Sequence, residues 1–401
     1  MTEELYYSSA YITEFFAEVI SCERGKNGFE IILDRTAFFP EQGGQSSDIG
    51  VMRATGDSGQ EVHISHVSID KEGVIRHISD KEIAPGTEIL GEIDWDHRFS
   101  NMQQHTGEHI FSGLVHSKFG FENVGFHLSD AEVTMDYSGV LTAEDIREIE
   151  TEVNKAIWEN IGVRCEFPGK EELADINYRS KKELTGDIRI VTIPGYDVCA
   201  CCAPHVERTG EIGLLKVISC QNYKGGVRVS ILCGGRALGY LQDEHEILSK
   251  LSGMLTTSAD KVIPSLNKMR EENAELKLDL GKAREELIGY EMAGIDPDRK
   301  DVFLVKEAGI DSNVMRKTVN ALIEKHPGFC GVFVKSGEDR GGEGAEEYRF
   351  IVASGSDGKD CKALLEELKK TCNVKGGGSP QMIQGSLHTN SIEEAIQECM
   401  R

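Results

Sequence analysis

The first stretch of the chain, residues 8–92, alternates apolar and polar positions in short runs. YITEFFAEVISCE (residues 11–23) and GFEIILDRTAFF (residues 28–39) are the clearest runs, and glycine, asparagine and aspartate interrupt the pattern. Alternation with a period of two is typical of strands that bury one face. Many short strands separated by turns predict a small β-barrel or sandwich, and of these we assign residues 1–92 to a β-barrel domain with a glycine-rich loop.

The pattern changes near Ser100, where apolar positions begin to recur at helical spacing. The spacing of apolar positions predicts helices at residues 100–119 and 142–160, and Thr142 is placed to cap the second helix. Strand patterns follow at residues 125–138, 187–195 and 213–234. Helices and strands that alternate unevenly indicate an α+β domain, which we assign to residues 93–237.

Residues 238–297 form a charged helical segment with an apolar residue at every seventh position. The repeat consists of Leu248, Leu255, Val262, Met269, Leu276, Ala283 and Tyr290. Gly253 and Pro264 predict a break into two helices. The heptad spacing leaves two interpretations open, a helical linker packed on its own protein and a coiled-coil arm that joins two copies.

The last segment, residues 298–401, alternates strand and helix patterns. Strands are expected near residues 301–309, 330–337 and 348–355, and helices near Ser312–Lys325, Asp360–Lys370 and Ser391–Met400. This order predicts a small α/β domain that carries a GGG loop at residues 376–378. The chain as a whole is therefore predicted to be α+β, with a barrel, an α+β domain, a helical linker and a small α/β domain.

Charge and cysteine content limit the class of protein. The chain has 44 Lys and Arg and 68 Asp and Glu, so its net charge of −24 argues against a polyanionic partner unless cations gather locally. Two local basic stretches are Arg179, Lys181, Lys182 and Arg189, and Lys224, Arg228 and Arg236. Eleven cysteines without a secretory signal pattern favour metal binding or catalysis over disulfides. No apolar run is long enough to span a bilayer, so we expect a cytoplasmic protein with no membrane partner.

Two short motifs carry the ligand types that zinc prefers. His105 and His109 are four residues apart, so a helix places both imidazoles on one face. Cys201 and His205 repeat this spacing in a turn. Three imidazoles and one thiolate form a tetrahedral zinc set, and the thiolate disfavours Mg²⁺ and Ca²⁺. We therefore predict that these four residues bind Zn²⁺.

Both motifs leave alternatives open. Cys202 or Cys199 could supply the thiolate in place of Cys201. The HTGEH motif also matches an inverted metalloprotease pattern, in which its glutamate is a general base. That pattern gives the second motif no role, so we favour the zinc set and expect Glu108 to be a solvated carboxylate that points away from the histidine face.

Longer motifs resemble a known family. HTGEH and the later CCAPHVERTGEIG, together with TAFFPEQGGQSSDIG and GDIRIVTIPGYD, resemble the editing domain of alanyl-tRNA synthetase. KGGGSPQMIQGS is similar to the glycine-rich signature of the last domain of that synthetase. Because no aminoacylation motif is found before the barrel, we expect a stand-alone protein that resembles the long-form alanyl-tRNA editing proteins, the AlaX family.

The resemblance implies a trans-editing hydrolase that removes serine, with glycine as a second candidate, from tRNA for alanine. By motif position, the implied zinc ligands are His105, His109, Cys201 and His205. The implied substrate-binding residues are Thr36, Gly43, Gly44 and Gln45. Of these, Thr36 matches the residue that senses the serine hydroxyl, and Thr36 and Gln45 are the implied catalytic residues.

The implied partner is the acceptor end of a tRNA that carries a wrong amino acid. Candidate tRNA contacts are Arg189, Lys375, Gly376, Gly377 and Gly378, and a homodimer could form through the helical linker or the last domain. Ala203-Pro204 departs from the Gly-Thr that the family has before its last histidine. A non-catalytic tRNA-binding factor with a structural zinc stays open as the alternative from another class.

Overall fold

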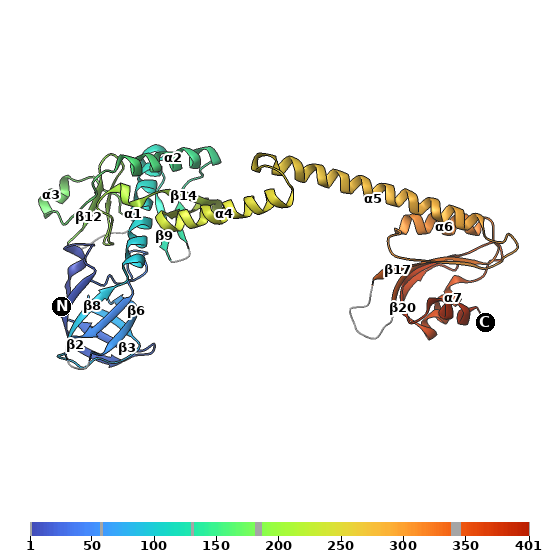
Figure 1. Ribbon diagram of the computed structural model, residues 1–401, viewed down its shortest axis with the longest axis horizontal. Helices are drawn as coiled ribbons and strands as arrows, with labels where there is room; N and C mark the ends of the chain where they lie inside the picture. Colours follow the sequence, from blue (N-terminus) through green and yellow to red (C-terminus); the bar gives the residue numbers. More distant parts are fainter. Residues whose placement is uncertain (1, 57–58, 130–131, 181–186, 338–345, 401) are drawn as a thin grey trace. The chain divides into compact units, whose positions relative to one another are not determined.

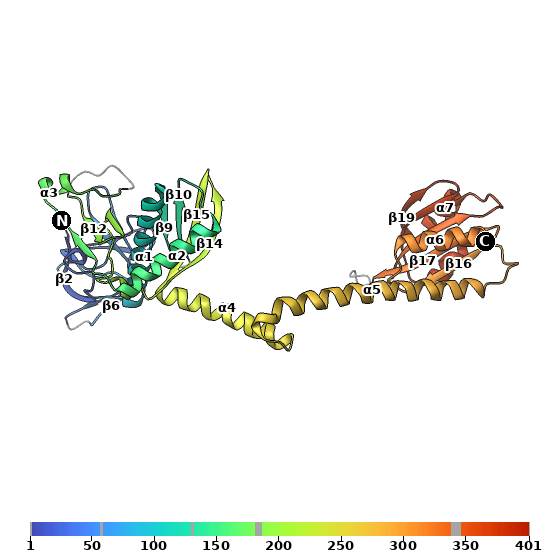
Figure 2. The same ribbon diagram turned by 90° about the horizontal axis from the view of Figure 1, so that it is seen from above.

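The computed structural model describes residues 2–56, 59–129, 132–180, 187–337 and 346–400. Its contacts divide the chain into two compact units, Met1–Lys250 and Leu251–Arg401 (Figures 1 and 2). The division falls inside the segment that the sequence assigns to the helical linker, and the four-domain division stays a prediction. Within the described ranges, no helix is both long and apolar enough to cross a membrane.

Six antiparallel strands of the first unit close into the barrel that the alternating pattern predicts. In order of pairing they are β2 (Glu14–Arg24), β3 (Phe29–Leu33), β7 (Ile75–Ser79), β6 (Glu61–Ile69), β5 (Gly50–Ala54) and β8 (Glu88–Ile93). Alternate residues face the interior, as in β7, where Ile75, His77 and Ser79 are buried. Two short segments, β1 (Glu3–Glu4) and β4 (Arg35–Thr36), form a parallel pair. The sequence prediction of a barrel is confirmed.

The rest of the first unit is built around helix α1 (Trp95–Phe119), which contacts two sheets (Figure 1). One sheet has the order β14 (Leu215–Tyr223), β15 (Gly226–Cys233), β10 (Val133–Tyr137) and β9 (Asn123–Leu128), and the other has β11 (Arg164–Glu166), β12 (Ile190–Ile193) and β13 (Asp197–Ala200). Every residue from 101 to 115 is buried, so α1 is enclosed on all sides. The α+β prediction is confirmed.

Two further helices complete this part of the chain. Helix α2 (Ala143–Glu159) begins where the sequence predicts, because the Thr142 hydroxyl accepts from the Asp145 amide at 3.2 Å. The Asp145 carboxylate bonds back to the Thr142 amide at 2.7 Å, which completes a capping box. The short helix α3 (Lys170–Asp175) has no buried residue.

A fully buried ion pair joins α1 to the loop between β4 and β5. Arg98 Nε lies 2.9 Å and 3.0 Å from the two carboxylate oxygens of Asp48, and both side chains have no exposed surface. The other guanidinium nitrogens donate to the carbonyls of Ala10 at 2.8 Å and Ala37 at 2.6 Å. The carboxylate also accepts from the Phe39 amide at 2.6 Å. These added hydrogen bonds compensate the cost of burying both charges and fix the loop on the helix.

The second unit is an α/β body with a five-stranded sheet. The strand order is β16 (Val302–Lys306), β17 (Phe329–Gly337), β18 (Glu346–Ser354), β20 (Met382–Thr389) and β19 (Asn373–Gly378). Helix α6 (Ser312–Ile323) and the end of α5 (Val262–Ala293) pack on one face, and α7 (Cys361–Thr371) and α8 (Ile392–Cys399) pack on the other. Helix α4 (Gly234–Met254) ends before α5 begins, so the predicted break between two helices is confirmed.

The expected GGG loop is a strand, so that prediction is wrong. Gly376, Gly377 and Gly378 pair with β20 and, with Lys375, belong to the edge strand β19. A Cβ on Gly376 would lie 2.6 Å from a backbone oxygen of β20, so the glycine permits a close approach of the two strands. Glycine-rich composition signalled a loop, but backbone pairing decided the conformation.

Substitution of Arg98 by methionine is expected to destabilise the first unit strongly. Removing one partner leaves the Asp48 charge buried without compensation, which costs about 3–5 kcal/mol of unfolding free energy. The two tryptophans of the chain, Trp95 and Trp158, both lie in the first unit. Urea unfolding followed by tryptophan fluorescence therefore measures the stability of this unit.

Arg53→Met is the matched control for Arg98→Met. Arg53 pairs with Glu61 on the barrel surface, where its side chain is 43% exposed. Exposed ion pairs contribute less than about 1 kcal/mol, so the control should unfold close to the wild type. Equal losses in the two variants would contradict a special role for the buried pair.

Candidate functional site

Four side chains from two segments meet at the predicted metal site. His105 and His109 lie one turn apart on α1, and Cys201 and His205 lie on the loop after β13. The ligand atoms of the four residues all lie within 4.8 Å of one another. The three imidazoles are at most 3% exposed. The structure thus brings together all four residues that the two motifs single out.

The spacing of these atoms suits a tetrahedral ion. The Cys201 sulfur lies 3.5 Å from His105 Nε2 and 3.4 Å from His205 Nε2. Zinc bonds of about 2.0–2.1 Å to nitrogen and about 2.3 Å to sulfur give a nitrogen–sulfur edge of about 3.5 Å in a tetrahedron. Donor types and distances therefore fit Zn²⁺, which these residues would hold.

The two alternative thiols are placed less favourably than Cys201. Cys202 does not belong to the grouped ligand atoms of the described residues, and burial raises its pKa to about 12. Cys199 belongs to a second buried group with His109 and Asp197, and burial raises its pKa to about 11. The Cys201 sulfur faces two of the Nε2 atoms, so the geometry favours Cys201 as the thiolate.

Each imidazole is oriented through its other ring nitrogen. The Nδ1 atom of His105 lies 2.7 Å from Gln45 Oε1, that of His109 lies 2.9 Å from Asp197 Oδ2, and that of His205 lies 3.0 Å from Thr106 Oγ1. The Thr106 hydroxyl donates to the Met102 carbonyl, so it accepts from His205. The amide oxygen and the carboxylate can only accept. All three rings therefore carry their proton on Nδ1 and direct Nε2, as an acceptor, toward the metal position.

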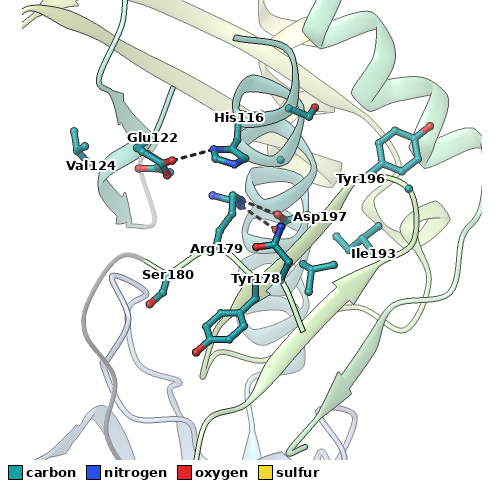
Figure 3. Close-up of a pocket in the computed structure, with 15 residues that line it drawn as sticks. His116, Glu122, Val124, Tyr178, Arg179, Ser180, Ile193, Tyr196 and Asp197 are labelled. Atoms are coloured by element: carbon teal, nitrogen blue, oxygen red, sulfur yellow. Dashed lines mark hydrogen bonds and ion pairs between the residues drawn. The ribbon is translucent and has the colours of Figure 1, made fainter. Parts of the chain in front are cut away.

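Asp197 links His109 to Arg179. Its two oxygens accept from Arg179 Nε at 2.7 Å and Nη2 at 2.9 Å (Figure 3). Burial opposes the ionisation of Asp197, but hydrogen bonds and charges from His109 and Arg179 outweigh it and hold its pKa below the usual value. The carboxylate behind His109 is therefore charged, which increases the basicity of that ring.

Asp197 and Thr106 were not predicted from the sequence. Asp197 lies four residues before Cys201, and Thr106 directly follows His105. A search for oxygen-bearing side chains next to each ligand motif would have found both. It would not have shown which imidazole each one contacts, because that depends on the packing of α1 against β13.

The glycine-rich loop of the barrel reaches the cluster. Gly43 and Gly44 have φ values of 65° and 87°, where a side chain is strained. The Gly44 carbonyl accepts from the Leu128 amide of β9 at 2.8 Å. A Cβ on Gly44 would lie 2.8 Å from the Phe126 carbonyl oxygen. Glycine at this position therefore lets the loop lie directly on β9, next to the His/Cys cluster.

Gln45 ends this loop and lies against His105. Its side chain is 1% exposed, and its oxygen is held by the His105 Nδ1 proton. Among the described residues, its Nε2 has no hydrogen-bond partner. A buried amide donor without a partner is costly, which indicates that a ligand or water completes it.

Thr36 lies in the barrel core, and no hydrogen bond of the described residues joins it to the cluster. Its hydroxyl is 2.8 Å from His77 Nε2 and accepts from the Phe38 amide at 3.1 Å. Burial lowers the pKa of His77 to about 4, so the ring is neutral at pH 7. His77 Nδ1 lies 3.0 Å from the Ile31 carbonyl, so Nδ1 carries the proton and Nε2 accepts from Thr36.

Glu108 is buried, so the expectation of a solvated carboxylate is wrong. It is 1% exposed because both sheets enclose α1. Its Oε1 accepts from Ser112 and Asn123, both at 2.6 Å, and its Oε2 lies 4.0 Å from His109 Nε2. A carboxylate therefore stands beside the cluster.

The expected basic residues are mostly engaged within the fold. Arg189 is 7% exposed and donates to the carbonyls of Cys201 at 3.1 Å and Ala203 at 2.8 Å, so it supports the ligand loop. Other pairs in the basic stretches are Arg179 with Asp197, Arg228 with Asp136, and Arg236 with Ser100 and Asn101. Lys181 and Lys182 lie outside the described residues.

Ala203, part of the departure from the family motif, is fully buried against the barrel core.

Comparison with known proteins identifies relatives of this chain. Residues 188–230 match the family "Threonyl and Alanyl tRNA synthetase second additional domain", and residues 2–97 match "tRNA synthetases class II (A)". Alanyl-tRNA editing protein AlaX-L of Pyrococcus horikoshii is 28% identical over 406 residues, which cover 98% of this chain and 96% of that protein. The chain is a homologue of AlaX-L.

The AlaX-L homologue is also related to alanine–tRNA ligases. That of Ignicoccus hospitalis is 33% identical over 297 residues, which cover 72% of this chain and 32% of the ligase. That of Methanoregula boonei is 27% identical over 400 residues, 96% of this chain and 41% of the ligase. The chain therefore spans less than half the length of these ligases. The solved C-Ala domain of the Aquifex aeolicus alanyl-tRNA synthetase matches 26% of the chain and 90% of that domain, with 20% identity and a TM-score of 0.20.

The AlaX-L homologue is expected to bind one equivalent of zinc. His205→Ala removes one of four ligands and should lower the zinc that remains after dialysis to near zero, as measured by plasma mass spectrometry. Substituted Co²⁺ should give a thiolate-to-metal absorption band that Cys201→Ser abolishes. Cys202→Ser is the control and should keep the band, whereas its loss in that variant would assign the thiolate to Cys202.

His77 is expected to make the stability of the first unit depend on pH. The unfolded ring binds a proton near pH 6.5 and the folded ring only near pH 4. The contribution of His77 is therefore complete above pH 6.5 and is lost as the pH falls toward 4, by about 1.4 kcal/mol per pH unit. Unfolding of the wild type and of His77→Gln by urea, followed by tryptophan fluorescence, should show a shallower pH slope for the variant. Parallel slopes would count against a neutral buried His77.

Proposed function

We propose that the AlaX-L homologue hydrolyses the ester bond that joins serine to tRNA for alanine. The glycyl ester of the same tRNA is the proposed second substrate. The observation that carries this proposal is the buried set of three oriented imidazoles and one thiolate beside the unpartnered amide of Gln45. The similarity to AlaX-L along 98% of the chain supports the same activity. The proposed partner is the acceptor end of the misacylated tRNA.

The proposed chemistry requires little beyond orientation and charge stabilisation. An aminoacyl ester is already activated, so a fixed water and a donor for the developing oxyanion are sufficient. Zn²⁺ held by His105, His109, Cys201 and His205 would act as a Lewis acid or grip the substrate. Four protein ligands would fill a tetrahedral site, so the proposed reaction uses a water that is held by other residues of the chain.

Gln45 is the proposed oxyanion donor. The proton on His105 Nδ1 holds the amide oxygen, so the amide cannot flip and its NH₂ group must point away from that ring. The NH₂ group has no partner among the described residues, so it can donate to a substrate oxygen without breaking a protein hydrogen bond. A donor that is fixed before the reaction lowers the cost of reorganisation.

Glu108 is the proposed acceptor for the attacking water. Ser112 and Asn123 hold one carboxylate oxygen, and the other lies 4.0 Å from His109 Nε2. A water between the cluster and this oxygen could donate one hydrogen bond to it. The carboxylate would then orient the oxygen lone pair of that water toward the ester carbon.

Thr36 is the proposed selector of serine over alanine. Its hydroxyl proton is committed to His77, and the Phe38 amide occupies one of its lone pairs. The Thr36 oxygen can therefore only accept a hydrogen bond from a ligand, and the hydroxyl group of serine can donate one. Alanine lacks that proton, so it would leave the buried acceptor unpaired. In the described conformation Thr36 is fully buried, so this role requires the substrate to reach the barrel core.

Turnover of purified esters tests the proposed function. With substrate in excess, the zinc-loaded protein should release serine from seryl-tRNA for alanine over many cycles and act much more slowly on the alanyl ester. The double variant His105→Ala, His109→Ala should lose both zinc and activity. Absence of turnover on either ester by the wild type would leave a tRNA-binding factor with a structural metal as the better explanation.

Gln45→Glu separates the metal site from the donor in this experiment. The glutamate keeps an oxygen for His105 but loses the NH₂ group, so zinc binding should stay near one equivalent. The rate constant kcat should fall by about 10²–10³, as when one oxyanion donor is removed. A Gln45→Glu variant with normal kcat would show that Gln45 only supports His105.

A further inference from the structure

The free cysteines of the second unit fall into two classes. Cys330 and Cys361 have no exposed surface, and each thiol donates to a backbone carbonyl inside the fold. Cys372 and Cys399 are partly exposed and lie at the rim of the apolar cluster between the sheet and helices α7 and α8. Among the described cysteines of this unit, only Cys372 and Cys399 are therefore open to a small reagent.

The thiols of Cys372 and Cys399 meet at one hydroxyl group. Thr371 Oγ1 lies 3.7 Å from the Cys372 sulfur and 3.8 Å from the Cys399 sulfur. The hydroxyl donates its single proton to the Leu368 carbonyl at 3.3 Å, so it accepts from both thiols. Because both sulfur atoms contact one oxygen, they are less than two contact distances apart. Thr371 is exposed, so this meeting point faces solvent.

The two cysteines come from different elements. Cys372 directly follows α7, and Cys399 is the last residue of α8. The segment between them contains strands β19 and β20 and nearly all of α8. Helix α8 has eight residues and packs through the buried side chains of Ile392 and Ala395. Because a helix this short is marginal by itself, a covalent link between the two cysteines would hold its end in place.

We propose that Cys372 and Cys399 are a modification site, where a small disulfide of the glutathione type oxidises the two thiols to an intramolecular disulfide. One protein thiolate attacks a sulfur of the reagent, whose S–S bond breaks and releases one thiol. The second protein thiolate attacks the protein sulfur of this mixed disulfide and releases a second thiol. Two protein thiols are oxidised, one reagent disulfide is reduced, and the two protons of the protein thiols end on the released thiols.

The disulfide should resist reduction once it has formed. Burial raises the pKa of the Cys399 thiol, although the hydrogen bond with Thr371 opposes this effect. A thiolate of high pKa is a poor leaving group, so a reducing thiol displaces Cys399 slowly. The same property slows the forward reaction, because little Cys399 thiolate is present. The site therefore responds to lasting oxidation and not to brief oxidation.

Peptide mapping tests the link. The reduced full-length protein is treated with glutathione disulfide, the remaining thiols are alkylated, and the protein is digested with trypsin. Cleavage after Lys370 and Lys375 gives peptides 371–375 and 376–401, which carry one cysteine each. They should be recovered as one disulfide-linked product, in equal yield at high and low protein concentration. Recovery only as separate adducts with glutathione, or a link between two copies that is lost on dilution, would overturn the proposal.

Two serine variants are matched for this experiment. Cys372→Ser should leave Cys399 free or as an adduct with glutathione. Cys220 is an exposed cysteine of β14 in the first unit, so Cys220→Ser should give the same linked product as the wild type. A linked product of peptide 376–401 that persists in Cys372→Ser would assign Cys399 to another cysteine and contradict the pair.

Hydrogen exchange measures the effect of the link on α8. Peptides that cover residues 392–399 should exchange at least about tenfold more slowly after oxidation, because the disulfide restricts opening of the helix. The same treatment should leave the exchange of Cys372→Ser unchanged. Equal exchange in the oxidised and reduced wild type would overturn the constraint on α8. Neither measurement uses the His/Cys cluster or an ester substrate, so the outcome is independent of the proposed function.

Discussion

The buried pair of Arg98 and Asp48 is the interaction on which the first unit depends. Arg98 belongs to the helix that carries the two histidines, and Asp48 belongs to the loop that carries Gln45. The same guanidinium donates to the carbonyls of Ala10 and Ala37, so one side chain joins the helix to the chain just before β2 and just after β4. If the loop shifted on the helix, Gln45 would no longer meet His105. The geometry of the cluster is therefore set by an ion pair that contains none of its ligands.

The four members of the His/Cys cluster could be predicted from the sequence because each pair is local. A four-residue spacing places His105 and His109 on one face of a helix whatever the helix packs against. The acceptors behind the rings depend on tertiary contacts between segments, so spacing alone could not assign Gln45 to His105 or Asp197 to His109. The barrel strands and the capped helix α2 could likewise be predicted, because the alternation of apolar and polar residues indicates the strands and the Thr142 cap indicates the start of the helix.

The errors share a physical origin. Glu108 was expected on a solvated helix face, but α1 has sheets on both sides and no solvated face along residues 101–115. The glycines of residues 376–378 were expected in a loop, but they pair with β20 at the edge of a sheet. In both cases the environment of the segment, and not its composition, decided the outcome. Local sequence carries little information about what covers a helix or which strand lies next to another.

The dispersed origin of the cluster has a consequence for biosynthesis. Its ligands span residues 105 to 205, and the side chain that orients His105 comes from residue 45. Contacts so far apart in sequence slow folding, because loop-closure entropy opposes them. On the ribosome, the barrel and α1 emerge with only two histidines, a weak and unselective pair of ligands. Cys201 and His205 follow about a hundred residues later, so the nascent chain can assemble the complete His/Cys cluster only after most of the first unit has been synthesised.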